Sequence, residues 1–273
     1  MTALGTVFRP QFAPELLRPM ADAAEATGLE LLWVWEDCFS ESGIATAAAA
    51  LAWTSTVRVG IGLLPVPLRN VALTGMELAT LHRLFPDRVI VGVGHGVQGW
   101  MGQAGARVSS PLTLLREHLD ALRALLRGEE VSVDGTYVKL DRVRLDWPPT
   151  RPVKIYAGGI GPKTLRLTAE AADGTLTVAD VSADGIRQIR ELVGPDQEII
   201  AALYAATGPG AEERLRRESP EVGVAGDAEA IAAGVRELVA AGANTVIVQP
   251  TGDEPDPVAF VHLVATQIRP LIP

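Results

Sequence analysis

The chain has 273 residues, of which 48 % are apolar and 21 % are charged, and its mean hydropathy is +0.21. This composition supports a sizeable buried core and excludes an intrinsically disordered chain. The net charge is −9 and the sequence has no basic cluster, which excludes the usual electrostatic footprint of a nucleic-acid-binding protein.

Export and membrane insertion are not indicated by the sequence. Apolar runs are short and broken by polar residues, and the first residues lack a basic segment followed by a hydrophobic one. The single cysteine, Cys38, cannot form an internal disulfide. We therefore expect a cytoplasmic protein that acts on a small molecule and binds neither nucleic acid nor membrane.

Short β-branched and apolar runs alternate with longer amphipathic stretches, which is typical of βα units around a parallel sheet. Eight strands are predicted, in chain order, at residues 4–8, 29–35, 57–63, 88–93, 153–157, 174–178, 198–205 and 245–249. Helices are predicted at residues 14–27, 71–84, 111–127, 163–172, 182–193, 227–241 and 257–268.

Three stretches depart from this alternation. A Gly-rich loop at residues 94–105 follows the fourth strand, and residues 131–133 and 137–145 predict a β-hairpin around an Asp-Gly turn. The segment 207–221, rich in Gly, Pro and charge, is predicted as a loop or short helix.

The whole pattern predicts one α/β domain over residues 1–273, a (β/α)8 TIM barrel with a β-hairpin insertion between helix 4 and strand 5. An open doubly wound sheet is the less favoured alternative. In a TIM barrel the active site lies at the carboxyl ends of the strands.

Residues that follow the predicted strands are therefore the candidates for the site. They include Arg9, Asp37, Cys38, Gly62, Leu63, Leu64, Gly94, His95, Gly96, Ala179, Asp180 and Gln249. Asp37, Cys38 and His95 are the candidate catalytic residues, because a carboxylate or an imidazole at a strand end can exchange protons. Alternatively, Asp37 only belongs to a polar loop, Cys38 is a small buried apolar residue, and His95 is a solvated or structural histidine. No base stands near Cys38 in the sequence to activate its thiol.

The other three histidines, His82, His118 and His262, fall within predicted helices. No spacing among the four histidines resembles a metal site, so no bound metal is predicted.

A strand, a Gly-rich turn and a helix start follow one another at residues 155–163, and this arrangement predicts a phosphate site. Glycine lets the backbone approach an anion, and the amides of a helix N-terminus point at it. The residues of this predicted site are Ala157, Gly158, Gly159, Ile160, Gly161, Pro162 and Lys163. The alternative is a tight turn in which Pro162 only favours the helix start. In the same way, Gly94 and Gly96 leave room for a flat ring or simply serve core packing.

Several motifs, in matching order and spacing, resemble the luciferase-like flavin monooxygenase superfamily. They are Val59-Gly60-Ile61-Gly62-Leu63-Leu64-Pro65, Leu68-Arg69-Asn70, Glu77-Leu78-Ala79-Thr80-Leu81, residues 88–94, Ser110-Pro111-Leu112, Gly135-Thr136-Tyr137, residues 158–163 and Ala171-Ala172-Asp173-Gly174. Within the superfamily, the chain is most similar to the subgroup that uses coenzyme F420, with reduced FMN as the alternative cofactor.

The resemblance implies that the cofactor phosphate sits on residues 158–163 and that the ring lies over the ends of strands two to four. It also implies a bulge with a non-prolyl cis peptide at Gly62-Leu63 or Leu63-Leu64, which would support the ring. Cys38 stands where the family often has a histidine, and this departure weakens the case for proton transfer at that position. Val97 stands where a sugar-phosphate dehydrogenase of the subgroup has an acidic residue, which argues against that substrate.

The expected function is hydride transfer between coenzyme F420 and a small organic substrate. The alternatives are a reduced-FMN monooxygenase, a non-catalytic flavin-binding barrel, and a barrel enzyme that acts on a phosphorylated metabolite without redox chemistry. The resemblance also implies a homodimer.

Overall fold

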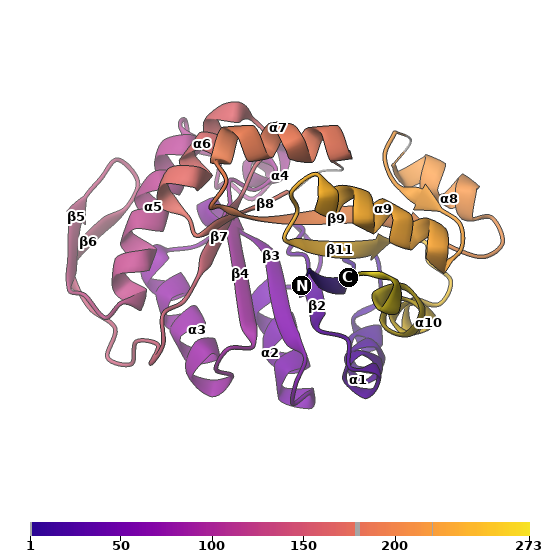
Figure 1. Ribbon diagram of the computed structural model, residues 1–273. Coiled ribbons are helices and arrows are strands. Elements are labelled where there is room, and N and C mark those ends of the chain that lie inside the picture. Colours follow the sequence, from indigo (N-terminus) through magenta and orange to yellow (C-terminus); the bar gives the residue numbers. More distant parts are fainter. Residues whose placement is uncertain (1, 178–180, 220) are drawn as a thin grey trace.

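A closed barrel of parallel strands forms the centre of the computed structural model, which describes residues 2–177, 181–219 and 221–273. Within these residues eight strands pair in the order β1-β2-β3-β4-β7-β8-β9-β11, and β11 pairs with β1 to close the barrel (Figure 1). They are β1 (Ala3–Phe8), β2 (Leu31–Val34), β3 (Arg58–Pro65), β4 (Val89–Gly94), β7 (Ile155–Gly158), β8 (Gly174–Leu176), β9 (Glu198–Ala206) and β11 (Thr245–Pro250). The predicted TIM barrel is confirmed.

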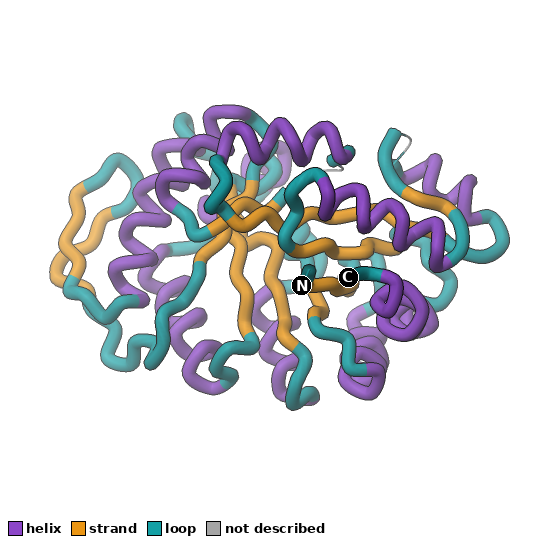
Figure 2. The backbone as a smooth tube through the Cα atoms, viewed as in Figure 1, coloured by secondary structure: helices purple, strands orange, loops and turns teal. Residues whose placement is uncertain are grey.

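Helices surround the barrel on the outside (Figure 2). They are α1 (Leu17–Thr27), α2 (Gly43–Trp53), α3 (Val71–Leu84), α4 (Gln98–Gln103), α5 (Pro111–Leu126), α6 (Pro162–Ala171), α7 (Ala183–Val193), α8 (Ala211–Glu218), α9 (Ala228–Ala240) and α10 (Pro257–Leu263). A π-helical turn at Val264–Ile268 continues α10, and a two-residue strand β10 (Val224–Ala225) pairs with the last residues of β9, Ala205 and Ala206.

Hairpin strands β5 (Val131–Asp134) and β6 (Lys139–Val143) pair antiparallel and lie outside the barrel, as predicted. Glu117 of α5 holds the hairpin, because its carboxylate accepts hydrogen bonds from the amides of Thr136, Tyr137 and Val138 at 2.8–2.9 Å. The insertion therefore leaves the order of the barrel strands unchanged.

Two apolar layers build the core. The smaller layer fills the inside of the barrel with Val7, Leu31, Trp33, Tyr156, Leu176, Ile200 and Ile247. The larger one lies between the strands and the helices. Glycine is required where indole rings press on β3, since a Cβ on Gly60 would lie 2.3 Å from Cδ2 of Trp33. A filled interior leaves the barrel ends as the places for sites.

Strand β3 carries the bulge that the family resemblance implies. Its register against β4 shifts between Ile61 and Leu64, and the Gly62-Leu63 peptide bond is cis. The bulge turns Gly62 and Leu63 toward the barrel mouth, where both line a cavity.

Two helices were not predicted. The sequence of α2 is almost entirely small and apolar, so it lacks the polar face that produces a helical periodicity. Helix α4 is a six-residue helix inside the predicted Gly-rich loop. The predicted sixth strand extended to Val178, but Val178 and the rim residues Ala179 and Asp180 lie outside the described residues.

Candidate active site

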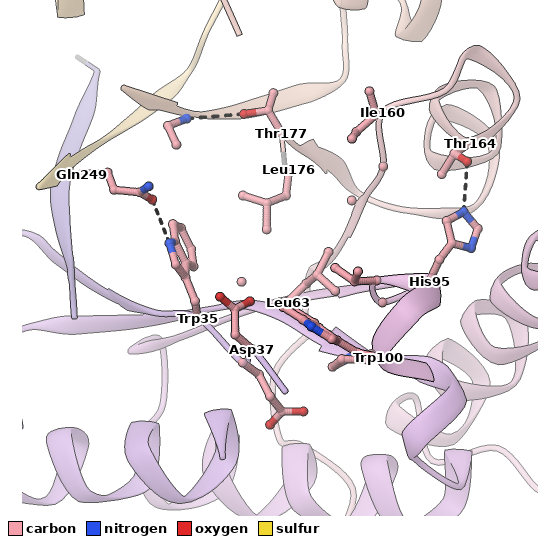
Figure 3. Close-up of a pocket in the computed structure, with 18 of the residues that line it drawn as sticks. Trp35, Asp37, Leu63, His95, Trp100, Ile160, Thr164, Leu176, Thr177 and Gln249 are labelled. Atoms are coloured by element: carbon pink, nitrogen blue, oxygen red, sulfur yellow. Dashed lines mark hydrogen bonds between the residues drawn. The ribbon is translucent and has the colours of Figure 1, made fainter. Parts of the chain in front are cut away.

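A cavity of about 560 Å3 opens at the carboxyl ends of the barrel strands (Figure 3). It is lined by Arg9, Trp35, Glu36, Asp37, Gly62, Leu63, Pro65, His95, Gly96, Val97, Trp100, Gly158, Gly159, Ile160, Gly161, Thr164, Leu176, Thr177, Ala202, Tyr204 and Gln249. A cavity of this size, with mainly apolar walls and a few convergent polar groups, is typical of a cofactor or substrate site.

One end of the cavity is formed by the glycine turn between β7 and α6. Gly161 is the N-cap of α6, and no side chain of the described residues caps this helix end. A Cβ on Gly159 would lie 2.3 Å from Cγ2 of Thr164, so the turn packs tightly onto the first turn of α6. Around Gly161, by contrast, a Cβ would find no atom within 4 Å. The turn thus presents uncapped helix amides to an open space, which is the geometry of an anion site.

His95 lies at the same end of the cavity as the glycine turn (Figure 3). Its Nε2 atom and Oγ1 of Thr164 are 2.9 Å apart and share a hydrogen bond, which ties the loop after β4 to α6. Burial lowers the pKa of His95, so its imidazole is neutral at physiological pH. His95 is therefore placed to support the glycine turn.

Trp35 and Gln249 form the opposite end of the cavity, where the indole Nε1 of Trp35 donates to Oε1 of Gln249 at 2.7 Å (Figure 3). Arg9, whose side chain is 5 % exposed, donates to Oε1 of Glu218 at 2.6 Å and to the carbonyl of Pro250 at 2.9 Å. Its guanidinium also lies over the ring of Tyr204. This end combines an indole, an amide and a neutralised cation.

Asp37 and its neighbour Glu36 both line the cavity but are held differently. Glu36 accepts from both Nε and Nη2 of Arg69 and from the amide of Gly43, so its carboxylate is fully engaged. No described residue donates a hydrogen bond to the carboxylate of Asp37. Burial raises the pKa of Asp37, although the charge of Arg9 opposes this. Asp37 is thus the lining carboxyl group that can take up and release a proton.

The structure brings together nine of the predicted site residues around one cavity. These are Asp37, Gly62, Leu63, His95, Gly96, Gly158, Gly159, Ile160 and Gly161. Six others do not line it: Leu64, Gly94 and Ala157 are buried beneath it, Pro162 and Lys163 are exposed beyond it, and Cys38 lies beside it. A Cβ on Gly94 would lie 2.6 Å from Cδ2 of Leu63, so this glycine serves packing.

Four residues form the far end of the cavity, namely Arg9, Trp35, Tyr204 and Gln249. Sequence reasoning selected Arg9 and Gln249 by their place after predicted strands but gave them no role, and it did not select Trp35 or Tyr204. No local pattern marks Tyr204 on β9 or Trp35 after β2. Within the described chain, no group of three or more His, Cys, Asp and Glu side chains is placed to hold a metal ion, and no helix is long and apolar enough to cross a bilayer.

Comparison with known proteins gives a family and two kinds of relative. A family model described as luciferase-like monooxygenase matches residues 5–218. The 5,10-methylenetetrahydromethanopterin reductase of Methanolobus tindarius is 30 % identical over 192 residues, which cover 68 % of this chain and 59 % of that protein. An F420-dependent glucose-6-phosphate dehydrogenase of Nakamurella multipartita is 29 % identical over 182 residues, which cover 62 % of this chain and 53 % of that protein. The matches thus span less than two thirds of these relatives.

Solved structures share the whole fold. An F420-dependent secondary alcohol dehydrogenase, in complex with an F420-acetone adduct, superposes with a TM-score of 0.88 at 22 % identity, covering 100 % of this chain and 99 % of that one. The F420-dependent tetrahydromethanopterin reductase of Methanopyrus kandleri superposes with a TM-score of 0.85 at 19 % identity, covering 100 % and 99 %.

Proposed function

The chain belongs to the luciferase-like monooxygenase family, and on that premise we propose that it is an oxidoreductase that transfers hydride between coenzyme F420 and a small organic substrate. Both kinds of curated relative support the choice of reaction, since methylenetetrahydromethanopterin reductases and F420-dependent dehydrogenases are redox enzymes. The observation that carries the proposal is the cavity itself, which has an uncapped glycine turn at one end and a carboxyl group with a raised pKa in its wall.

The residues present fit a cofactor with a ribityl phosphate and a flat ring. Amides at the start of α6, next to Gly161, would hold the phosphate, because no side chain of the described residues occupies them. The cis peptide segment of Gly62 and Leu63 would lie under the ring, with Trp100 and Ile160 among the walls. A bound deazaflavin supplies the hydride donor or acceptor.

The chain itself positions the substrate, excludes water and moves a proton. Asp37 holds a proton at its carboxyl group and delivers it to the substrate oxygen or nitrogen that becomes basic as the substrate is reduced. Trp35 and Gln249, joined by their hydrogen bond, provide a rigid polar end for orienting a small carbonyl compound. The apolar side chains of Leu63, Trp100 and Leu176 keep water away from this space.

A neutral substrate fits the charges of the cavity better than a phosphorylated one. Among the described residues that line the cavity, Arg9 is the cation, and Glu218 already neutralises it. If the glycine turn binds the cofactor phosphate, a phosphate group on the substrate has no unpaired cation among the described lining residues to bind. We therefore infer a small ketone, alcohol or imine as the substrate class.

Replacing Gly161 tests whether the glycine turn holds the cofactor phosphate. Gly161 has φ −76° and ψ 149°, and a Cβ there meets open space, so Gly161→Asp and Gly161→Ser both fit the backbone and both give α6 a favourable N-cap. The added carboxylate of Gly161→Asp repels a phosphate, whereas the serine hydroxyl does not.

We expect Gly161→Asp to weaken F420 binding by about 100-fold or more, and Gly161→Ser by less than about tenfold, with Tm retained in both. Fluorescence titration of the coenzyme measures the affinity. Equal affinity of the two variants would contradict the phosphate site.

A further inference from the structure

A second cavity, of about 360 Å3, lies at the opposite end of the barrel. The first residues of five barrel strands line it, namely Leu31, Arg58, Val89, Glu198 and Thr245. It is therefore a cavity in the barrel floor. The stacked side chains inside the barrel, including Trp33 and Val7, lie between this floor cavity and the mouth, so the two cavities are separate.

The floor cavity contains a cation without a partner. Of the five charged side chains that line it, Asp87 pairs with Arg151, and Glu198 pairs with Lys154 at 2.5 Å. The half-buried Arg58 forms no ion pair or side-chain hydrogen bond with any described residue. The cavity therefore keeps one uncompensated positive charge, in a protein whose net charge is −9.

Two further polar groups line the floor cavity without adding negative charge. Burial and the hydrogen bond that Tyr156 donates to Glu198 raise the pKa of Tyr156, so its hydroxyl stays protonated. Burial lowers the pKa of His82 to about 4, and its Nε2 atom is buried without a hydrogen-bond partner among the described residues. A neutral imidazole with an unpaired nitrogen can donate to an oxyanion.

We propose that the floor cavity binds a small organic anion whose carboxylate or phosphate group lies on the guanidinium of Arg58. The planar fork of an arginine matches both groups in a bidentate manner, and an unpaired half-buried charge gains most from such a partner. The rest of the wall, which includes Pro86, Pro152 and Ile200, accommodates an apolar body. The volume exceeds what a lone phosphate needs, which favours an organic ligand over an inorganic ion.

Thermal unfolding tests the proposal with phosphate and acetate as probes, each compared with sodium chloride at equal ionic strength. The Gly161→Asp variant is the background, because it removes anion binding at the mouth. An anion that binds only the folded protein stabilises it by RT ln(1 + [L]/Kd), so Tm rises with the anion concentration. We expect phosphate, acetate or both to raise Tm, and Arg58→Met to weaken the apparent affinity by about tenfold or more.

Arg144 provides the matched control, since it is an exposed arginine outside both cavities, on the segment after the hairpin. Arg144→Met should respond to the anions as the background does. A response to phosphate alone indicates a phosphate-bearing ligand, and a response to acetate indicates a carboxylate. The proposal is wrong if neither anion acts beyond chloride, or if Arg58→Met responds like Arg144→Met.

Chemical modification provides a measurement that does not depend on the folding of any variant. Phenylglyoxal attacks unpaired guanidinium groups. Peptide mapping by mass spectrometry follows the modification of Arg58 and Arg144 in the protein without substitutions. We expect the anion that raises Tm to slow modification of Arg58 severalfold and to leave the rate at Arg144 unchanged. An unchanged rate at Arg58 overturns the proposal.

Discussion

Glu36 and Asp37 are neighbours in the sequence, yet their carboxylates lie in opposite environments. Glu36 is fixed by Arg69 and the amide of Gly43, whereas Asp37 faces the cavity with a raised pKa. Two adjacent carboxyl groups therefore have different roles. Glu36 holds the loop after β2 in place, and Asp37 is the carboxyl group to which we assign proton exchange in the proposed function.

Replacing Asp37 by asparagine should separate catalysis from stability. Because burial raises the pKa of Asp37 in the folded protein, ionisation of this group costs stability as the pH rises through that value. Asp37→Asn should therefore keep or raise Tm at neutral pH, while the rate of substrate reduction falls about 100-fold. Calorimetry and steady-state kinetics measure the two effects.

The pH dependence gives the sharper readout for Asp37. The acid form that donates the proton is lost as the pH rises, so reduction by the native protein should slow with increasing pH. Asp37→Asn should show a flat profile over the same range. An unchanged rate, or the same pH profile in the variant, would remove Asp37 from proton transfer.

The sequence predicted residues of the site by their place after strands. Of these, Asp37, His95 and the glycine turn line one cavity in the structure. The role of Arg9 was not predictable, because Glu218 lies 209 residues away and the pair forms only once the barrel closes. Gly94 does not line the cavity, and a Cβ there would lie 2.6 Å from Cδ2 of Leu63, which fits the packing alternative that the sequence left open.

At the scale of elements, α8 is the helix joined most directly to the candidate site. Its last residue, Glu218, accepts from Nη2 of Arg9 at 2.6 Å and from the amide of Gly252 at 2.7 Å. Arg214 of the same helix pairs with Glu254 at 3.5 Å. The segment after β9 is thereby fixed to the loops after β1 and β11, beside the polar end of the cavity.

Removing the carboxylate of Glu218 should release this helix. Glu218→Ala leaves the buried guanidinium of Arg9 without its carboxylate partner. This costs about 3 kcal/mol of the free energy that holds α8 against the loops after β1 and β11. We expect faster amide exchange in α8 and a raised KM for the substrate. Glu213→Ala, at an exposed position of the same helix, is the control and should change neither. Unchanged exchange in Glu218→Ala would contradict the role of the ion pair.

Elements with a clear amphipathic pattern were predicted closely. The predicted bounds of α5, 111–127, lie within one residue of those observed, and its leucines mark its buried face. Helix α2 was missed because its alanine-rich sequence has no polar face, and packing against β3 fixes it instead. Local sequence therefore identifies the elements whose periodicity reflects burial on one side.

At the scale of the whole molecule, barrel closure determines what the sequence can and cannot reveal. The count of eight alternating strands predicted the barrel, because each βα unit is a local pattern. Sequence patterns do not predict the contacts that exist only after β11 pairs with β1. These contacts include the hydrogen bond between Trp35 and Gln249 and the charged floor around Arg58. The two ends of the barrel are therefore properties of the assembled fold.

Titration of the protein with coenzyme F420 and with FMN, each followed by fluorescence under anaerobic conditions, measures whether this barrel mouth binds a deazaflavin. We expect micromolar binding of F420, binding of FMN at least about tenfold weaker, and oxidation of reduced F420 when a suitable small ketone or imine is added. Binding of neither coenzyme in the micromolar range would contradict the proposed function.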